Sequence, residues 1–142
     1  MAGARVGYAI GHADLIQAFN KVRNHFGMAR ISQGGALAAL ADQSHLQDTL
    51  SRIAESREAI CNIARTNGLA PIPSATNFVA IDCGKDVKLA RSVLNKLIEM
   101  DVFVRMPFVA PQDRAIRVSC GRPEDLDLLA DVMPKALEEA RR

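Results

Sequence analysis

The stretch FVAIDCGKDVKLARSVLNKLIEM, residues 78–100, contains both kinds of regular element that the chain uses. Residues 78–81 form a short apolar run that is typical of a buried strand. Asp86 can then cap a helix whose apolar residues recur at helical spacing, namely Val87, Ala90, Leu94, Leu97 and Ile98. A strand followed directly by an amphipathic helix predicts an α/β fold for this part of the chain.

The residues that follow continue this pattern. We predict strands over 102–106 and 115–120, the second because apolar and polar side chains alternate along it. A last helix is predicted from Pro123, a residue that suits the first turn of a helix. Its apolar residues share one face: Leu126, Leu129, Ala130, Met133 and Leu137.

The N-terminal side is mostly helical in pattern. We predict a strand over 4–10, a helix over 14–27 and a second helix capped by Ser32. Ser44 and Gln47 form a capping-box pattern, and a long helix of about six turns should follow it.

These elements divide the chain into three predicted parts. Residues 1–43 lack enough strand to form a sheet, so we expect them to belong to something larger. The long helix, residues 44–67, is a connector. Residues 68–142 hold three predicted strands and two helices, enough for a two-layer α/β unit.

Composition excludes several classes of protein. The 142 residues are 49% hydrophobic and 24% charged, values that are typical of soluble globular proteins. Lys and Arg exceed Asp and Glu by only two and are scattered, so no nucleic-acid partner is expected. Every apolar run is too short to span a membrane. The three cysteines are far apart and odd in number, which favours a reduced, cytoplasmic protein.

Few residues suggest chemistry by their spacing. The three histidines are isolated from one another and from the cysteines, so no metal site is expected. The sequence contains no G-x-S-x-G motif and no P-loop. Arg117 and Arg105 each interrupt or end an apolar strand, and Arg5 lies between glycines. Each of these guanidinium groups could receive an anion, or could simply lie on a solvated face.

Four segments, in order along the chain, resemble the fold-type I pyridoxal-phosphate aminotransferases, and most closely their histidinol-phosphate aminotransferase-like branch. AGARVGYAIG (2–11) is similar to the segment that follows the cofactor lysine in this family, and PSATNFV (73–79) resembles its P-S-x-x-N-F element. VFVR (102–105) and IRVSCG (116–121) resemble its G-I-x-V-R strand and its L-R-I-T-V-G element.

The resemblance implies a role for four residues. Arg5 matches the arginine that contacts the phosphate of pyridoxal phosphate, and Arg117 matches the arginine that receives the anionic end of the substrate. Asn77 and Arg105 match positions near the substrate end of the pocket. The implied fold is the C-terminal small domain of an aminotransferase, preceded by one strand and helices of the large cofactor-binding domain in residues 1–43.

The resemblance also implies a lysine that bonds to the cofactor, and this chain has no match for it. The family lysine stands farther before the G-x-R arginine than the four residues that precede Arg5. The five lysines present match no catalytic position: Lys21, Lys85, Lys88, Lys96 and Lys135. We therefore expect a C-terminal part of an aminotransferase that has no catalytic residue of its own and is inactive alone.

Partners and an alternative follow from this interpretation. The parent enzyme would move an amino group from an amino acid or an amino-alcohol phosphate to a 2-oxo acid, with pyridoxal phosphate as cofactor. The chain itself is expected to form a homodimer or a larger oligomer and not to bind pyridoxal phosphate. The alternative is a standalone, non-catalytic α/β module that retained this part of the fold for protein interaction.

Overall fold

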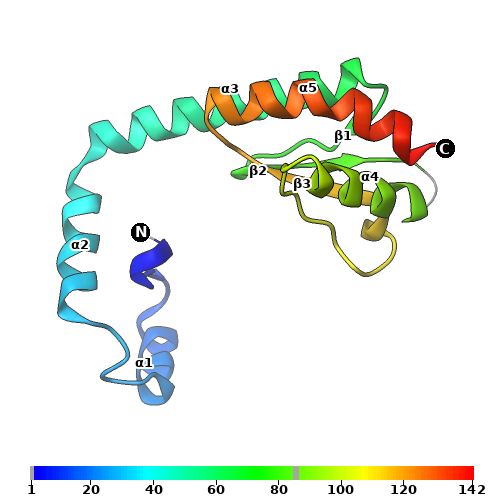
Figure 1. Ribbon diagram of the computed structural model, residues 1–142. Helices are drawn as coiled ribbons and strands as arrows, with labels where there is room; N and C mark the ends of the chain where they lie inside the picture. Colours follow the sequence, from blue (N-terminus) through cyan, green and yellow to red (C-terminus); the bar gives the residue numbers. More distant parts are fainter. Residues whose placement is uncertain (1, 85–86) are drawn as a thin grey trace. The chain divides into compact units, whose positions relative to one another are not determined.

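The computed structural model describes residues 2–84 and 87–142, which form two compact units, Met1–Asp48 and Thr49–Arg142 (Figure 1). The elements are η1 (Ala2–Ala4), α1 (Ala13–Val22), α2 (Arg30–Ala41), α3 (Gln43–Thr66), β1 (Ala70–Pro71), β2 (Phe78–Asp82), α4 (Val87–Glu99), η2 (Gln112–Arg114), β3 (Ala115–Ser119) and α5 (Pro123–Ala140). Asp86, the predicted cap of α4, and Lys85 lie outside the described residues.

The second unit contains an antiparallel sheet in the order β1-β2-β3. Val79 of β2 pairs with Val118 of β3, and Ile81 pairs with Ile116. These four apolar side chains are buried, whereas the residues between them are half-buried on the opposite face. The α/β class and the predicted strands near 78–81 and 115–120 are therefore confirmed.

The predicted strand over 102–106 is wrong, because this segment makes only one bridge, from Arg105 to Arg117. Its alternation is nevertheless real: Val104 and Met106 are buried, while Arg105 is exposed. Pro107 follows and has no N–H to extend a ladder. The third strand of the sheet is instead the two-residue β1, which the sequence pattern did not predict.

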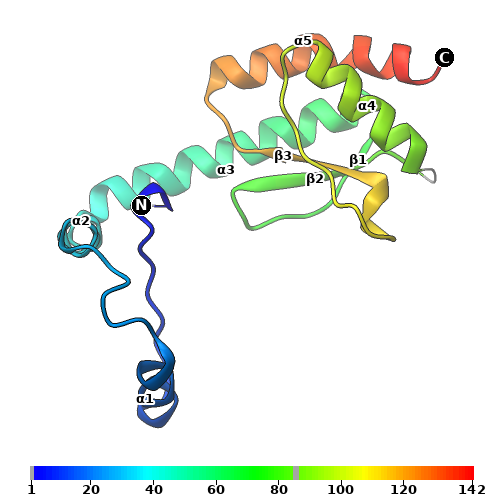
Figure 2. The same ribbon diagram turned by 60° about the horizontal axis from the view of Figure 1, so that its bottom comes forward.

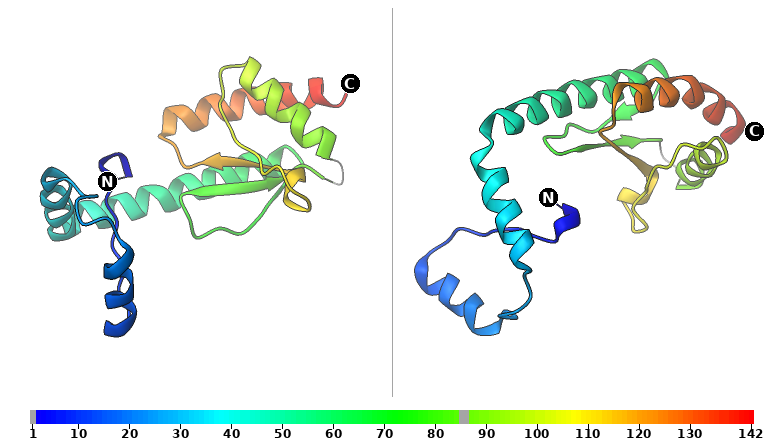
Figure 3. Two further views of the ribbon diagram at one scale, coloured as in Figure 1. Left: turned by 90° about the horizontal axis from the view of Figure 1, so that it is seen from below. Right: turned by 60° about the vertical axis from the view of Figure 1, so that its left-hand side comes forward.

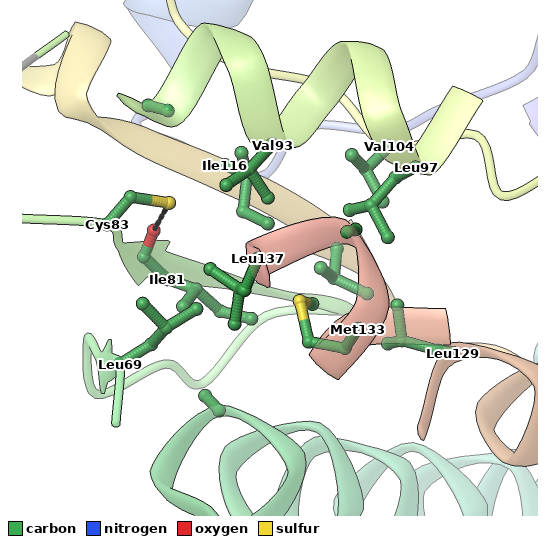
Figure 4. Packing of buried hydrophobic residues seen from close by; sticks show 14 of the residues in the cluster. Leu69, Ile81, Cys83, Val93, Leu97, Val104, Ile116, Leu129, Met133 and Leu137 are labelled. Carbon is green, nitrogen blue, oxygen red and sulfur yellow. Dashed lines mark hydrogen bonds between the residues drawn. The ribbon is translucent and has the colours of Figure 1, made fainter. Parts of the chain in front are cut away.

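The core of the second unit lies between the sheet and its helices (Figure 4). Val93 and Leu97 of α4, together with Met133 and Leu137 of α5, gather beside the inward-facing residues of β2 and β3. Ile60 and Ala64 add one face of α3 and are fully buried. The helical periodicities predicted for these segments thus place their apolar faces in one cluster.

The long helix α3 confirms the predicted length, with 24 residues, but its cap differs. Asp42, rather than Ser44, accepts the N–H of His45 (3.0 Å), and the Ser44 hydroxyl itself donates to Asp42 (3.0 Å). The backbone bond from His45 is the main reason that the pKa of Asp42 is lowered. The helix begins one residue earlier than the predicted capping box because an aspartate precedes it.

The first unit is helical, and the predicted strand over 4–10 is wrong. After η1 the chain runs to α1 without regular structure (Figures 2 and 3). A strand requires a hydrogen-bonded neighbour, and no other strand occurs among the described residues of this unit.

The two helices of the first unit are present, with different ends from those predicted. α1 ends at Val22, short of the predicted residue 27. Ser32 lies inside α2 instead of capping it, and its hydroxyl donates to the carbonyl of Ala4 (2.8 Å). Across the whole described part of the chain, no helix is both long and apolar enough to cross a membrane.

The three cysteines are free thiols that differ in burial. Cys83 is 4% exposed and burial raises its pKa to about 11, whereas Cys61 and Cys120 are half-buried. Because only the thiolate is nucleophilic, we expect iodoacetamide at pH 8 to label Cys61 and Cys120 well before Cys83. Peptide mass spectrometry after timed labelling measures the order. Equal rates for all three in the folded chain would contradict it, whereas equal rates in urea are expected.

Candidate functional site

The candidate site lies on the face of the sheet that points away from the core of the second unit. Phe78, Ala80 and Asp82 alternate with buried residues along β2, and Arg117 occupies the same face of β3 because it pairs with Ala80. Asp82 forms an ion pair with Arg114. The acidic residue of β2 is therefore paired with Arg114 and not with Arg105 or Arg117.

Arg105 and Arg117 are brought directly opposite each other. The Arg105 N–H donates to the Arg117 carbonyl (3.1 Å), and the Arg117 N–H donates back to the Arg105 carbonyl (2.6 Å). Two residues that exchange both backbone bonds carry their side chains on one face of the sheet. Within the described residues neither guanidinium has an ion-pair partner, so two cations share one surface without a counterion.

Phe78 contacts this pair of arginines through Arg117. The guanidinium carbon of Arg117 lies over the Phe78 ring, 4.9 Å from its centroid. This cation–π contact involves the face of the ring and does not use the N–H groups of Arg117 in an ion pair, so they can donate to an acceptor. The sequence predicted Phe78 only as a strand residue, because the register that brings it beside Arg117 is not visible in either segment alone.

Asn77 lies at the start of β2, next to Phe78. Its carbonyl accepts the N–H of Cys120 (2.9 Å), which extends the pairing of β2 with β3 by one residue. Its side chain is exposed and makes no hydrogen bond within the described residues. Asn77 thus directly precedes Phe78 and continues the pairing of β2 with β3, the strand that carries Arg117, but no hydrogen bond within the described residues joins its side chain to either arginine.

The turn before β2 is fixed by hydroxyl groups and by Arg57. The hydroxyls of Ser74 (2.6 Å) and Thr76 (3.2 Å) both donate to the Phe78 carbonyl. Arg57 of α3 donates from Nη1 to the Thr76 carbonyl (3.0 Å). The pattern of the long helix gave no signal for this role of Arg57, since the helix and the turn are separate in sequence.

Arg5 belongs to the first unit, whereas Asn77, Arg105 and Arg117 belong to the second. It follows η1, is exposed, and has a backbone φ of 53°, in the left-handed region that residues other than glycine seldom adopt.

Four lysines lie within the described residues, all of them on helices. Lys21 lies on α1, Lys88 and Lys96 on α4, and Lys135 on α5. The pKa of Lys96 is raised, chiefly because Nζ bonds to Glu99 (2.7 Å) and also to Glu139 (3.3 Å). A raised pKa keeps the amine protonated, the opposite of what covalent catalysis by lysine needs.

No three His, Cys, Asp or Glu side chains within residues 2–84 and 87–142 are grouped so that they could hold a metal ion. The outer face instead carries two guanidinium groups, which are donors suited to an anion. A planar, two-oxygen acceptor such as a carboxylate can take two parallel N–H bonds from one guanidinium, and the second guanidinium adds charge.

The sequence of this chain is similar to those of known aminotransferases. Histidinol-phosphate aminotransferase 1 of Pseudomonas aeruginosa is 34% identical over 136 residues, covering 94% of this chain and 38% of that protein. The enzyme of the same name from Gluconacetobacter diazotrophicus is 34% identical over 137 residues, with the same two shares. This chain therefore spans about 38% of the length of these relatives.

A solved structure agrees with the sequence comparison. Histidinol-phosphate aminotransferase from Sinorhizobium meliloti, crystallised in complex with pyridoxal-5'-phosphate, is 50% identical and superimposes with a TM-score of 0.92, covering 97% of this chain and 38% of that one. The model of the family described as aminotransferase class I and II matches residues 1–133. Because that match covers most of the chain, including Arg5, Arg105 and Arg117, the chain belongs to the aminotransferase class I and II family.

Proposed function

We propose that this chain provides the substrate-anion receptor of an aminotransferase that uses pyridoxal phosphate. The complete enzyme would move an amino group from an amino acid or an amino-alcohol phosphate to a 2-oxo acid. One observation carries the proposal: Arg105 and Arg117 stand opposite each other without an ion-pair partner among the described residues. Such an arrangement has a cost of charge repulsion that a bound anion would relieve.

Arg117 is the proposed receptor of the anionic end of the substrate. Its neighbours Ile116 and Val118 are buried and fix the backbone of β3, so the guanidinium starts from a rigid element. Arg105 would add a second positive charge. Asn77, exposed at the start of β2, is proposed to contribute near the same end of the substrate.

Among residues 2–84 and 87–142, the structure shows no complete site for pyridoxal phosphate. Arg5 is the proposed contact to the cofactor phosphate, and it is one cation on an exposed turn. The four lysines in the described part lie on helices, and Lys96 is held protonated by two carboxylates. We therefore propose that the amine that bonds to the cofactor is not one of the lysines of this chain, and we derive no chemical step through the cofactor.

The proposal also includes a cellular compartment and a second candidate function. The three free thiols support a reducing, cytoplasmic environment. The second candidate is a standalone, non-catalytic α/β module that retained this part of the fold for protein interaction. The spectral experiment below separates the two candidates.

The proposed activity is tested on the complete protein with added pyridoxal phosphate. An aminotransferase should show a visible absorption band of one cofactor per subunit that changes with an amino acid donor and returns with a 2-oxo acid. A non-catalytic module should show no such cycle. Failure of the band to respond to any amino donor tried would contradict the proposed function.

The 142-residue chain is expected to bind pyridoxal phosphate only weakly and without a fixed stoichiometry, because Arg5 supplies a single phosphate contact. Titration of the chain should give at most a weak absorption change that does not saturate at one to one. The Arg5→Ala variant is the matched comparison and should give a smaller absorption change than the unaltered chain, because it lacks the proposed phosphate contact. A stoichiometric band that an amino acid abolishes and a 2-oxo acid restores would contradict this prediction.

Self-association of the chain is a separate prediction, which rests on α1. Leu15, Phe19 and Val22 on α1 are 53%, 52% and 83% exposed, and Phe26 beyond it is 95% exposed. Adjacent exposed apolar side chains of this kind are usually covered by another surface. We expect dimers or larger species in sedimentation at micromolar concentration, and fewer of them after Phe19→Ser. A clean monomer of the unaltered chain would contradict this expectation.

A further inference from the structure

We propose that Phe78 is a positioning residue for Arg117: its ring holds the guanidinium in place on the outer face of the sheet before an anion binds. The inference rests on the proposed function of Arg117 as an anion receptor. It extends that function by assigning a role to an aromatic side chain that would not itself touch the substrate anion.

The register of the sheet places the two side chains together. Phe78 pairs with Ser119, and Arg117 pairs with Ala80, so the two residues are diagonal neighbours on one face of antiparallel strands. Diagonal neighbours are within reach of an aromatic ring and a long side chain. The distance of 4.9 Å from the Arg117 guanidinium carbon to the ring centroid shows that they use this reach.

Hydrogen bonds fix the backbone of Phe78, from which the ring projects. The Phe78 carbonyl accepts from the hydroxyls of Ser74 and Thr76, and the Phe78 N–H donates to the Thr76 hydroxyl (3.4 Å). Two hydroxyl groups from the turn that precedes Phe78 therefore fix the start of β2. A ring in this position is a stable platform, whereas Phe108, which is 86% exposed, lies outside any helix or strand.

Arg117 needs such a platform because of what lies opposite it. Arg105 pairs with it across the strands, and like charges directly opposite each other repel. A long side chain with rotamer freedom would turn away from this repulsion and would have to be ordered again by each ligand. Stacking on Phe78 keeps the guanidinium beside Arg105 and reduces the ordering that binding requires.

Two interpretations of the stack make different predictions. If Phe78 only covers the sheet, replacing it alters stability and leaves anion binding at Arg117 unchanged. If Phe78 positions Arg117, removing the ring weakens anion binding while the sheet stays folded, and another aromatic ring restores it. Phe78→Leu and Phe78→Tyr separate these cases, and Phe108→Leu is the matched control.

The experiment follows the arginine side-chain NMR signals of the 15N-labelled 142-residue chain during titration with 2-oxoglutarate. We expect Phe78→Leu to raise the apparent Kd at Arg117 by about fivefold, the range of a cation–π contact, and to shift the Arg117 Nε–Hε signal as the ring current is lost. The apparent Kd at Arg117 in Phe78→Tyr and in Phe108→Leu should stay within about twofold of the value for the unaltered chain, because both variants keep an aromatic ring beside Arg117. An unchanged Kd in Phe78→Leu, with saturable binding by the unaltered chain, would overturn the positioning role and leave the proposed function intact.

A second measurement needs no substitution. In the unaltered chain, 15N relaxation should show the Arg117 Nε–Hε group to be more ordered than that of the exposed Arg91 on α4. Equal mobility of the two groups would overturn the inference even if Phe78→Leu failed to fold. Absence of any saturable binding at Arg117 in the unaltered chain would overturn the receptor role and, with it, the positioning role of Phe78.

Discussion

Replacing Arg117 by lysine in the complete enzyme is expected to lower kcat/KM by about a hundredfold, which corresponds to about 2 to 3 kcal/mol of lost transition-state stabilisation. Lysine keeps the positive charge but cannot form the two parallel N–H bonds of a guanidinium. The loss should therefore appear with carboxylate-bearing or phosphate-bearing substrates alike. Steady-state kinetics with an amino acid donor and a 2-oxo acid measures it.

The control for this substitution is Arg91→Lys, on the exposed face of α4. It replaces a guanidinium by an amine at a surface position. The change in transition-state stabilisation, calculated from the ratio of the kcat/KM values, should stay below about 0.5 kcal/mol. Circular dichroism should show that both variants are folded. Near-unchanged kinetics of Arg117→Lys with every substrate tried would mean that the resemblance at this position has no functional content.

Replacing Ile116 by alanine is expected to lower the free energy of unfolding of the 142-residue chain by about 2 to 5 kcal/mol. Ile116 is fully buried in β3, paired with the equally buried Ile81, and its loss leaves a cavity beneath the strand that carries Arg117. Urea denaturation followed by circular dichroism measures the change.

Ile72→Ala is the matched control, because Ile72 is 47% exposed in the segment before β2. It removes the same atoms from a site that is already in contact with water, so the loss should be below about 1 kcal/mol. If Ile116→Ala were as mild as this control, the inward orientation of Ile116 in β3 would be contradicted.

Helices were the part of the fold most open to prediction from the sequence. The apolar faces of α3, α4 and α5 recur at helical spacing, and the hydrogen bonds of a helix close within one turn, so the evidence for each helix lies in its own residues. The caps were less predictable. Asp42 rather than Ser44 caps α3, because several residues near a helix start can accept the same N–H and the geometry selects one.

A predicted strand formed only where a second strand lay beside it to accept and donate backbone hydrogen bonds. Residues 78–82 and 115–119 are strands, as their apolar patterns indicated, because they pair with each other. Residues 4–10 and 102–106 have comparable patterns and are not strands, since the first has no strand beside it among the described residues of its unit and the second makes a single bridge. Pairing partners are distant in sequence, and no local pattern reveals them.

The residues of the candidate site were predictable from the sequence, but their arrangement was not. The motifs around Arg5, Asn77, Arg105 and Arg117 pointed to the aminotransferase family, because each can be read from a few consecutive residues. The bridge that sets Arg105 against Arg117 and the stack of Arg117 on Phe78 depend on the register between strands. Residue identity is local information, whereas the juxtaposition of two side chains from different strands exists only once long-range hydrogen bonds have formed.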